Sequence, residues 1–101
     1  MNPQVSIQKD QLASLCSARG IKRLAVYGSA LRLEFGPESD IDVLVEFEEG
    51  RTPGLLGISR LEQELSPLVG KRNVDLRTPE DLSLYFRRQV IEEAEVQYGQ
   101  R

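Results

Sequence analysis

The sequence predicts a layered α/β domain, and three observations support that fold class. Apolar runs of strand type alternate along the 101 residues with stretches of helical periodicity. Glycine and proline stand where one pattern gives way to the next. Each helical stretch carries an apolar face that has to be buried against another layer. The expected strands cover residues 23–27, 40–47 and 72–76, and the expected helices cover 6–19, 29–35, 55–69 and 79–97.

The first helix and strand follow from local patterns. Leu12, Leu15 and Cys16 fall on one helical face, and Gly20 provides a stop. We interpret Cys16 as a buried helix residue rather than a reactive thiol, because cysteine is among the most buried residue types. The run Leu24-Ala25-Val26-Tyr27 is of strand type and stops at Gly28.

A short helix or turn is expected at 29–35, followed by a Gly-Pro loop and the second strand. The third helix has an apolar face at four-residue and three-residue spacings and stops at Gly70. A short third strand precedes the last helical region, in which Leu82, Phe86, Val90 and Ala94 recur every four residues. These patterns leave open whether the sheet is mixed or fully parallel.

Composition, length and net charge exclude several classes of protein. Hydrophobic residues make up 40% and charged residues 29%, which is typical of a globular chain, and the length predicts a single domain over residues 1–101. A net charge of −3 argues against general nucleic-acid binding. The single cysteine excludes an internal disulfide, no secretion signal precedes the domain, and no apolar run is long enough to span a membrane. We therefore expect a cytoplasmic protein that does not bind membranes.

Two carboxylates at the start of the second strand are candidate metal ligands. Asp40 and Asp42 are two residues apart, so they point to the same face, while Ile41 and Val43 point to the other. Like charges at this spacing repel each other, and a divalent cation removes the conflict. Oxygen ligands suit Mg²⁺ or Mn²⁺, and the chain contains no His. Taken separately, Asp40 also fits a turn residue and Asp42 a solvent-facing strand residue.

The segment Gly28-Ser29 is a candidate phosphate site. Glycine allows close approach of another group to the backbone. Ser29 stands at the start of the expected short helix, where free N–H groups and the helix dipole favour an anion. Taken alone, Gly28 also fits a plain turn glycine. A phosphate site next to a metal site indicates a nucleoside triphosphate from which a group is transferred.

These residues together resemble a known signature. Gly28-Ser29, ten residues and then Asp40-x-Asp42 resemble the motif of the DNA-polymerase-β-like nucleotidyltransferase superfamily. The chain length resembles that of the minimal nucleotidyltransferases, often encoded as antitoxins of HEPN-domain toxins. The resemblance implies a nucleotidyltransferase fold, with a small mixed sheet and about four helices. It also implies a third carboxylate on a later strand, and Asp75 matches that position.

The resemblance implies an activity as well. An enzyme of this kind transfers AMP from ATP to a hydroxyl, here a tyrosine of a partner HEPN toxin, and releases pyrophosphate. Asp40, Asp42 and Asp75 would hold two Mg²⁺ ions, with Asp75 serving the acceptor side. Gly28, Ser29 and Arg32 would bind the nucleotide, although Arg32 fits a solvated helix charge equally well. One departure is Leu33, where relatives often carry glycine, so the turn after the short helix is expected to differ.

Other polar and aromatic residues have two interpretations each. Arg87 and Arg88 fit a solvated helix face better than contact with a nucleotide or an acidic partner. Tyr85, Phe86 and Tyr98 fit core or interface positions better than platforms for base stacking.

Two other functions are alternatives to protein adenylylation. One is a non-catalytic subunit that binds nucleotide or neutralises a partner by contact alone. The other is nucleotidyl transfer to a small molecule or to RNA, although such relatives usually carry further domains. The sequence does not name the acceptor, the base preference, the number of groups transferred or the oligomeric state, and it leaves a homo-oligomer open.

Overall fold

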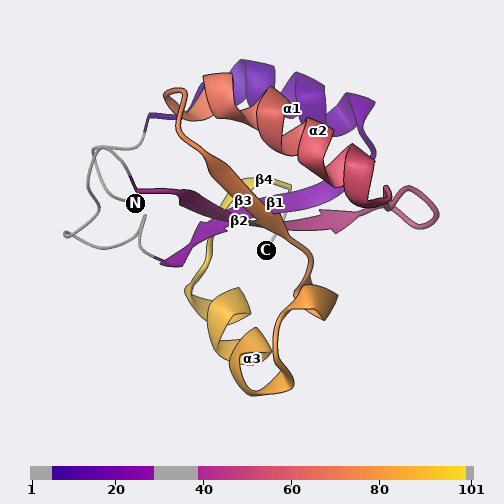
Figure 1. Ribbon diagram of the computed structural model, residues 1–101, viewed down its shortest axis with the longest axis vertical. Helices are drawn as coiled ribbons and strands as arrows, with labels where there is room; N and C mark the ends of the chain where they lie inside the picture. Colours follow the sequence, from indigo (N-terminus) through magenta and orange to yellow (C-terminus); the bar gives the residue numbers. More distant parts are fainter. Residues whose placement is uncertain (1–5, 29–38, 100–101) are drawn as a thin grey trace.

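Four strands form one mixed sheet in the computed structural model, which describes residues 6–28 and 39–99 (Figure 1). The spatial order of the strands is β3-β2-β1-β4. Strand β1 pairs antiparallel with β2 and with β4, while β3 runs parallel to β2. The mixed sheet implied by the family resemblance is therefore confirmed. The strands are β1 (Ile21–Tyr27), β2 (Ile41–Phe47), β3 (Val74–Arg77) and β4 (Glu95–Tyr98).

Helices cover both faces of this sheet, but to different extents. Helices α1 (Lys9–Ala18) and α2 (Leu55–Leu65) lie side by side on one face, and α3 (Leu84–Glu93) lies on the other (Figure 1). Two short 3₁₀ turns, η2 (Ser66–Val69) and η3 (Pro79–Asp81), precede β3 and α3. The helix expected at 29–35 falls outside the described residues, which contain three α-helices against about four expected.

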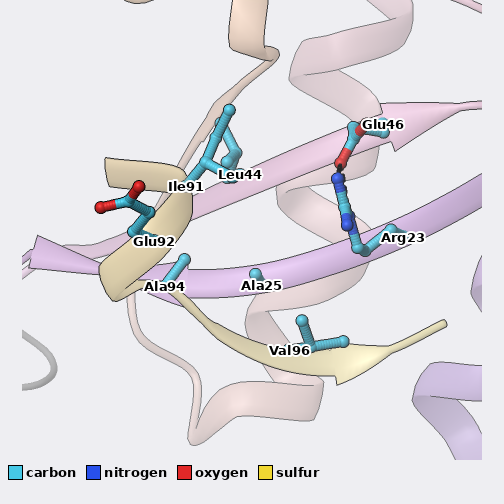
Figure 2. A pocket seen from close by; sticks show the side chains of 8 residues that line it. All are labelled: Arg23, Ala25, Leu44, Glu46, Ile91, Glu92, Ala94 and Val96. Carbon is cyan, nitrogen blue, oxygen red and sulfur yellow. Dashed lines mark hydrogen bonds and ion pairs between the residues drawn. The ribbon is translucent and has the colours of Figure 1, made fainter. Parts of the chain in front are cut away.

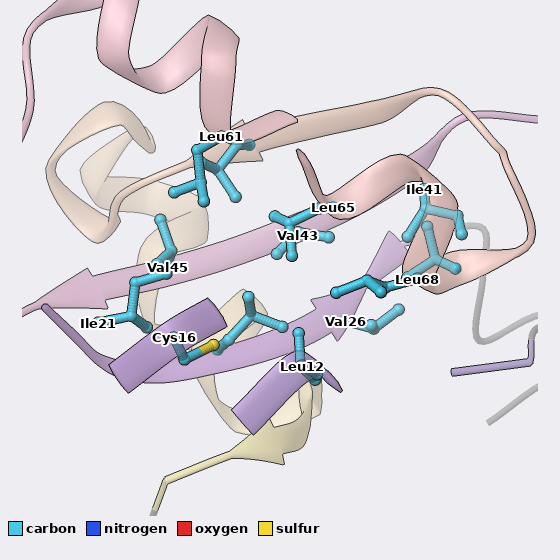
Figure 3. Close-up of a cluster of buried hydrophobic side chains, with 13 residues drawn as sticks. Leu12, Cys16, Ile21, Val26, Ile41, Val43, Val45, Leu61, Leu65 and Leu68 are labelled. Carbon is cyan, nitrogen blue, oxygen red and sulfur yellow. The ribbon is translucent and has the colours of Figure 1, made fainter. Parts of the chain in front are cut away.

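The hydrophobic core lies between the sheet and the α1–α2 layer (Figure 3). Alternate residues of β2 enter it, as the period of two predicts. Cys16 of α1 is fully buried, which confirms its structural interpretation, and burial raises the pKa of its thiol to about 11. The largest fully buried side chains are Leu12, Ile41, Leu65, Val26, Val43, Val45 and Cys16.

The expected boundaries of the third helix and third strand shift slightly. Helix α2 ends at Leu65 and continues as η2, because Pro67 stands at the start of that turn and cannot donate the next helical hydrogen bond. Gly70 closes this turn with φ +78, so the helical stretch stops at the glycine where the sequence predicted a stop. Strand β3 covers Val74–Arg77 rather than 72–76.

The helix predicted over 79–97 is wrong in its second part. The observed helix α3 ends at Glu93, and the backbone is extended at Ala94, with φ −64 and ψ 140. The following four residues pair with the outer edge of β1 as strand β4. The apolar spacing that includes Ala94 resembles helix periodicity, but Ala94 is buried because it leads the chain back to the sheet. An available strand edge outweighs local helical preference here.

Within the described ranges 6–28 and 39–99, none of the helices has the length and apolar character that a membrane crossing would require.

Candidate functional site

Asp42 and Asp75 lie side by side on the sheet face opposite the α1–α2 layer. They are register partners across the parallel pair β2–β3. Ile41 and Val43 flank Asp42 and point into the core, so Asp42 points away from it. Burial and the neighbouring Asp75 charge raise the pKa of Asp42, against a lowering effect of Arg77. The charged form of Asp42 is therefore disfavoured in the absence of a further cation.

The local backbone places β3 where this pairing needs it. The N–H of Ile41 donates to the carbonyl oxygen of Asn73 at 2.8 Å, which aligns the starts of β2 and β3. On the outer edge of β3, the N–H of Leu76 donates to Oε2 of Glu62 at 2.8 Å. Helix α2 thus satisfies an edge group that would otherwise lack a strand partner, and it holds Asp75 beside Asp42.

The end of β1 forms the third side of the site. Tyr27 is the register partner of Asp42 on β1. Burial, with the nearby Asp42 charge as the next cause, raises the pKa of Tyr27, so its hydroxyl is protonated at neutral pH. Gly28 follows with φ +74, and a Cβ built there would lie 2.6 Å from Oδ2 of Asp42. A side chain at position 28 would therefore force the Asp42 carboxylate to shift, and the positive φ independently favours glycine.

We expect Gly28→Ala to displace the Asp42 carboxylate and to weaken binding of Mg²⁺ with ATP at least about tenfold, or 1.4 kcal/mol. Gly50→Ala is a matched control, because Gly50 has φ +77 with nothing within 4 Å of a built Cβ. Both variants introduce a strained left-handed residue, at about 1–2 kcal/mol of stability. Calorimetric titration and thermal unfolding of both proteins separate the two effects. Equal nucleotide affinity in the two variants would contradict the role given to Gly28.

Arg77 lies next to this carboxylate pair on β3. Its Nε and Nη2 donate to Oδ2 of Asp75 at 3.4 and 3.2 Å. Both side chains are partly exposed, with 47% of the Arg77 side chain and 39% of the Asp75 side chain accessible. The Asp75 charge and this hydrogen bond raise the pKa of Arg77, which stays protonated.

The other predicted site residues lie at the rim or beyond the described chain. Asp40 is exposed just before β2, and its negative charge contributes to the raised pKa of Asp42. It lines an open hollow of about 520 Å³ together with Asn73 and residues of α2. Ser29, Arg32 and Leu33 lie outside the described residues. The structure thus brings Gly28, Asp42 and Asp75 together, whereas Asp40 precedes β2 and lines a hollow with residues of α2.

The residues present fit a divalent cation. The donors are carboxylate oxygens, Asp42 and Asp75 are neighbours of like charge, and Gly28 keeps the space beside Asp42 open. Over residues 6–28 and 39–99, no three His, Cys, Asp or Glu side chains are gathered closely enough to hold a metal by themselves. A bound ion at this place would therefore combine these carboxylates with oxygens from a ligand, as Mg²⁺ commonly does with phosphates.

A second pocket lies farther along the same sheet face, between β1, β2, β4 and α3 (Figure 2). It has a volume of about 230 Å³ and is lined largely by apolar side chains, among them Ala25, Leu44 and Ile91. Arg23 and Glu46 form an ion pair at one end of it. None of the residues of α3, which covers this pocket, is fully buried.

Arg87 and Arg88 differ in their roles. Arg87 donates to the backbone carbonyls of Pro79 at 2.6 Å and Leu82 at 3.3 Å, so it ties α3 to the preceding turn. The expectation of a solvated face is wrong for Arg87. Arg88 pairs with Glu92 on the exposed side of α3, as that expectation predicted.

The aromatic residues Tyr85, Phe86 and Tyr98 also differ from one another, in their burial. Tyr98 is partly buried and packs against the core. Tyr85 is 91% exposed and Phe86 is 61% exposed, so neither is a core residue. Leu84 beside them is 79% exposed, which makes the first turn of α3 an apolar surface.

Sequence reasoning missed two residues of the site. Arg77 could have been predicted from the sequence. It follows Asp75 by two residues, so in a strand that includes both their side chains lie on the same face. Tyr27 could not, because its place beside Asp42 depends on the register between β1 and β2. A one-residue slip of that register would have turned Tyr27 away from the carboxylates.

Comparisons with known proteins identify relatives of this chain. A curated relative from Methanocaldococcus jannaschii, named "Putative protein adenylyltransferase MJ0435", is 36% identical over 85% of this chain and 89% of its own. The protein adenylyltransferase MntA of Thermococcus cleftensis is 39% identical over 73% of this chain and 72% of its own.

Solved structures show the same fold. The one described as "Structure of putative minimal nucleotidyltransferase" superposes with a TM-score of 0.68 at 43% identity, covering 85% of both chains. A toxin–antitoxin structure with AMP-PNP superposes with a TM-score of 0.72 at 20% identity, covering 94% of this chain and 76% of that one. The nucleotidyltransferase domain model matches residues 9–96. With the paired carboxylates, the glycine beside them and this match over most of its length, the chain belongs to the nucleotidyltransferase domain family.

Proposed function

We propose that this protein is an antitoxin that transfers AMP from ATP to a hydroxyl group of a partner toxin. The observation that carries the proposal is the pairing of Asp42 with Asp75 beside Gly28, in a chain of the nucleotidyltransferase family. The relatives named protein adenylyltransferases support a protein acceptor. Solved neighbours that pair an antitoxin with a HEPN toxin support the class of partner.

Asp40, Asp42 and Asp75 are the residues that would hold Mg²⁺, with Mn²⁺ as the alternative. Bound Mg²⁺ would supply charge stabilisation for the displacement at the α-phosphate, at which pyrophosphate leaves. Asp42 orients the triphosphate from the centre of the site, because it lies between Tyr27 on β1 and Asp75 on β3. Gly28, with Ser29 and Arg32 after it in the motif, binds the phosphates.

Asp75 serves the acceptor side in this proposal. It lies on the edge strand β3 and is partly exposed, so a hydroxyl of a second protein can approach it without displacing core residues. A carboxylate there can accept the proton of the attacking hydroxyl. The acceptor hydroxyl is proposed to belong to a tyrosine, and residues 1–101 are proposed to act as a single domain.

The direct test is intact-mass analysis of a candidate HEPN partner after incubation with this protein, ATP and Mg²⁺. We expect the partner mass to rise by one or more AMP groups, and the increase to disappear in the presence of EDTA. A modified partner tyrosine is then located by peptide mapping. Neutralisation of the partner without any change in its mass would favour the non-catalytic subunit instead.

A further inference from the structure

Arg77 has a position that the proposed reaction does not by itself explain. It is the register partner of Leu44, two residues along the strand pair from Asp42 and Asp75 and therefore on the same face. Instead of extending into solvent, its guanidinium turns back along β3, and both Nε and Nη2 point to the same oxygen, Oδ2 of Asp75.

The charge of Arg77 acts on both carboxylates. The guanidinium is hydrogen-bonded to Asp75, and Asp75 is the register partner of Asp42 across the strand pair. Arg77 therefore supplies part of the positive charge that the two adjacent carboxylates need. A divalent ion would supply the same charge more strongly at the same place.

The guanidinium and a divalent ion compete for one carboxylate. A metal-ligating Asp75 needs its oxygens free, and in the described structure Oδ2 is engaged by Arg77. The ion pair is partly exposed, so it is weak enough for a ligand to open. A guanidinium released beside a triphosphate has phosphate oxygens as a new bidentate partner.

We propose that Arg77 is a positioning residue that occupies Asp75 in the metal-free protein and yields it when metal arrives together with nucleotide. This inference rests on the proposed function, because it takes Asp75 as a metal ligand. On this inference, binding of a divalent ion to Asp75 depends on nucleotide. Without nucleotide, a guanidinium released from Asp75 has only water as its partner. With nucleotide bound, the released guanidinium can donate to phosphate oxygens.

The test is a titration of nucleotide-free protein with Mn²⁺, with free Mn²⁺ measured by electron paramagnetic resonance. We expect Arg77→Gln to bind Mn²⁺ about three- to tenfold more tightly than the wild type, since it loses both the competing ion pair and a repelling charge. Arg88→Gln is the matched control, because it also removes a guanidinium from a carboxylate pair but lies on the outer side of α3. It should leave Mn²⁺ affinity unchanged.

A double-variant cycle separates competition for Asp75 from the general field of the guanidinium. In an Asp75→Asn background, Arg77→Gln should change Mn²⁺ affinity by less than about twofold. Unchanged or weaker Mn²⁺ binding by Arg77→Gln would overturn the inference, as would an equal gain in the Asp75→Asn background. Failure of the proposed function looks different, because Asp42→Asn would then bind Mn²⁺ as the wild type does.

Addition of AMP-PNP provides the second arm of the test. The advantage of Arg77→Gln over the wild type should shrink or reverse, because the wild-type guanidinium then gains phosphate oxygens as partners. An advantage of the same size with and without AMP-PNP would overturn the nucleotide-dependent part of the inference. Circular dichroism and thermal unfolding verify that each variant is folded.

Discussion

Asp42→Asn should abolish binding of Mg²⁺ with ATP in calorimetric titration and lower AMP transfer by at least about a thousandfold. Asp42 is the central carboxylate of the site, between Tyr27 and Asp75. Asparagine keeps its shape but removes the charge that a divalent ion requires. Several kcal/mol of charge stabilisation are lost with the ion, and each 1.36 kcal/mol corresponds to about tenfold in rate.

The same substitution should not harm the metal-free fold. Burial and Asp75 raise the pKa of Asp42 above its ordinary value, so the ionised form costs folding free energy at neutral pH. Because the folded-state pKa is the higher one, this cost appears as pH rises through the range between the two pKa values. Asp42→Asn removes the cost, and its thermal unfolding temperature in EDTA should equal or exceed that of the wild type.

Glu46→Gln is the control for Asp42→Asn. Glu46 lies on the same strand and the same face, but it pairs with Arg23 at the apolar pocket rather than with the site. It should retain binding of Mg²⁺ with ATP. If Asp42→Asn bound Mg²⁺ with ATP as tightly as the wild type, the assignment of the metal site would be wrong.

Asp75→Asn should separate catalysis from nucleotide binding. We expect ATP affinity to change by less than about tenfold, or 1.4 kcal/mol, because we propose that Asp75 serves the acceptor side rather than the triphosphate. The rate of AMP transfer should fall about a hundredfold or more, as in the loss of a general base. The fold should persist, because Asp75 is partly exposed and Glu62 holds the edge of β3 through Leu76 rather than through Asp75.

A paired assay measures this difference. AMP transfer is followed by the mass of the partner, and neutralisation of the toxin is followed by cell growth. If neither the wild type nor Asp75→Asn changes the partner mass while both neutralise it, the antitoxin acts by contact and the catalytic proposal fails. A partner modified normally by Asp75→Asn would remove only Asp75 from the site.

The sequence alone determined the class of fold and predicted the aspartates and the glycine of the candidate site. Period-two alternation in 40–47 identified β2 and set Asp42 apart from Ile41 and Val43, because a strand with one buried face requires that pattern. Helices α1 and α2 were found from their apolar faces, and Gly70, with positive φ, closes the 3₁₀ turn that continues α2. Aspartates two residues apart after a Gly-Ser pair also indicated the nucleotidyltransferase family, to which the chain belongs, while the metal chemistry they predict stays a prediction.

Tertiary structure decided what depends on pairing between distant segments. Strand β4 exists because β1 had an open edge, and the local sequence 95–98 is too short to indicate a strand against a helical pattern. Tyr27 and Asp42 meet only through the antiparallel register, and Asp42 and Asp75 only through the parallel one. The close approach of the Asp42 carboxylate to Gly28 likewise arises across the sheet and not from the local sequence. Local sequence specifies which face a side chain takes, whereas strand order and register specify which side chains become neighbours.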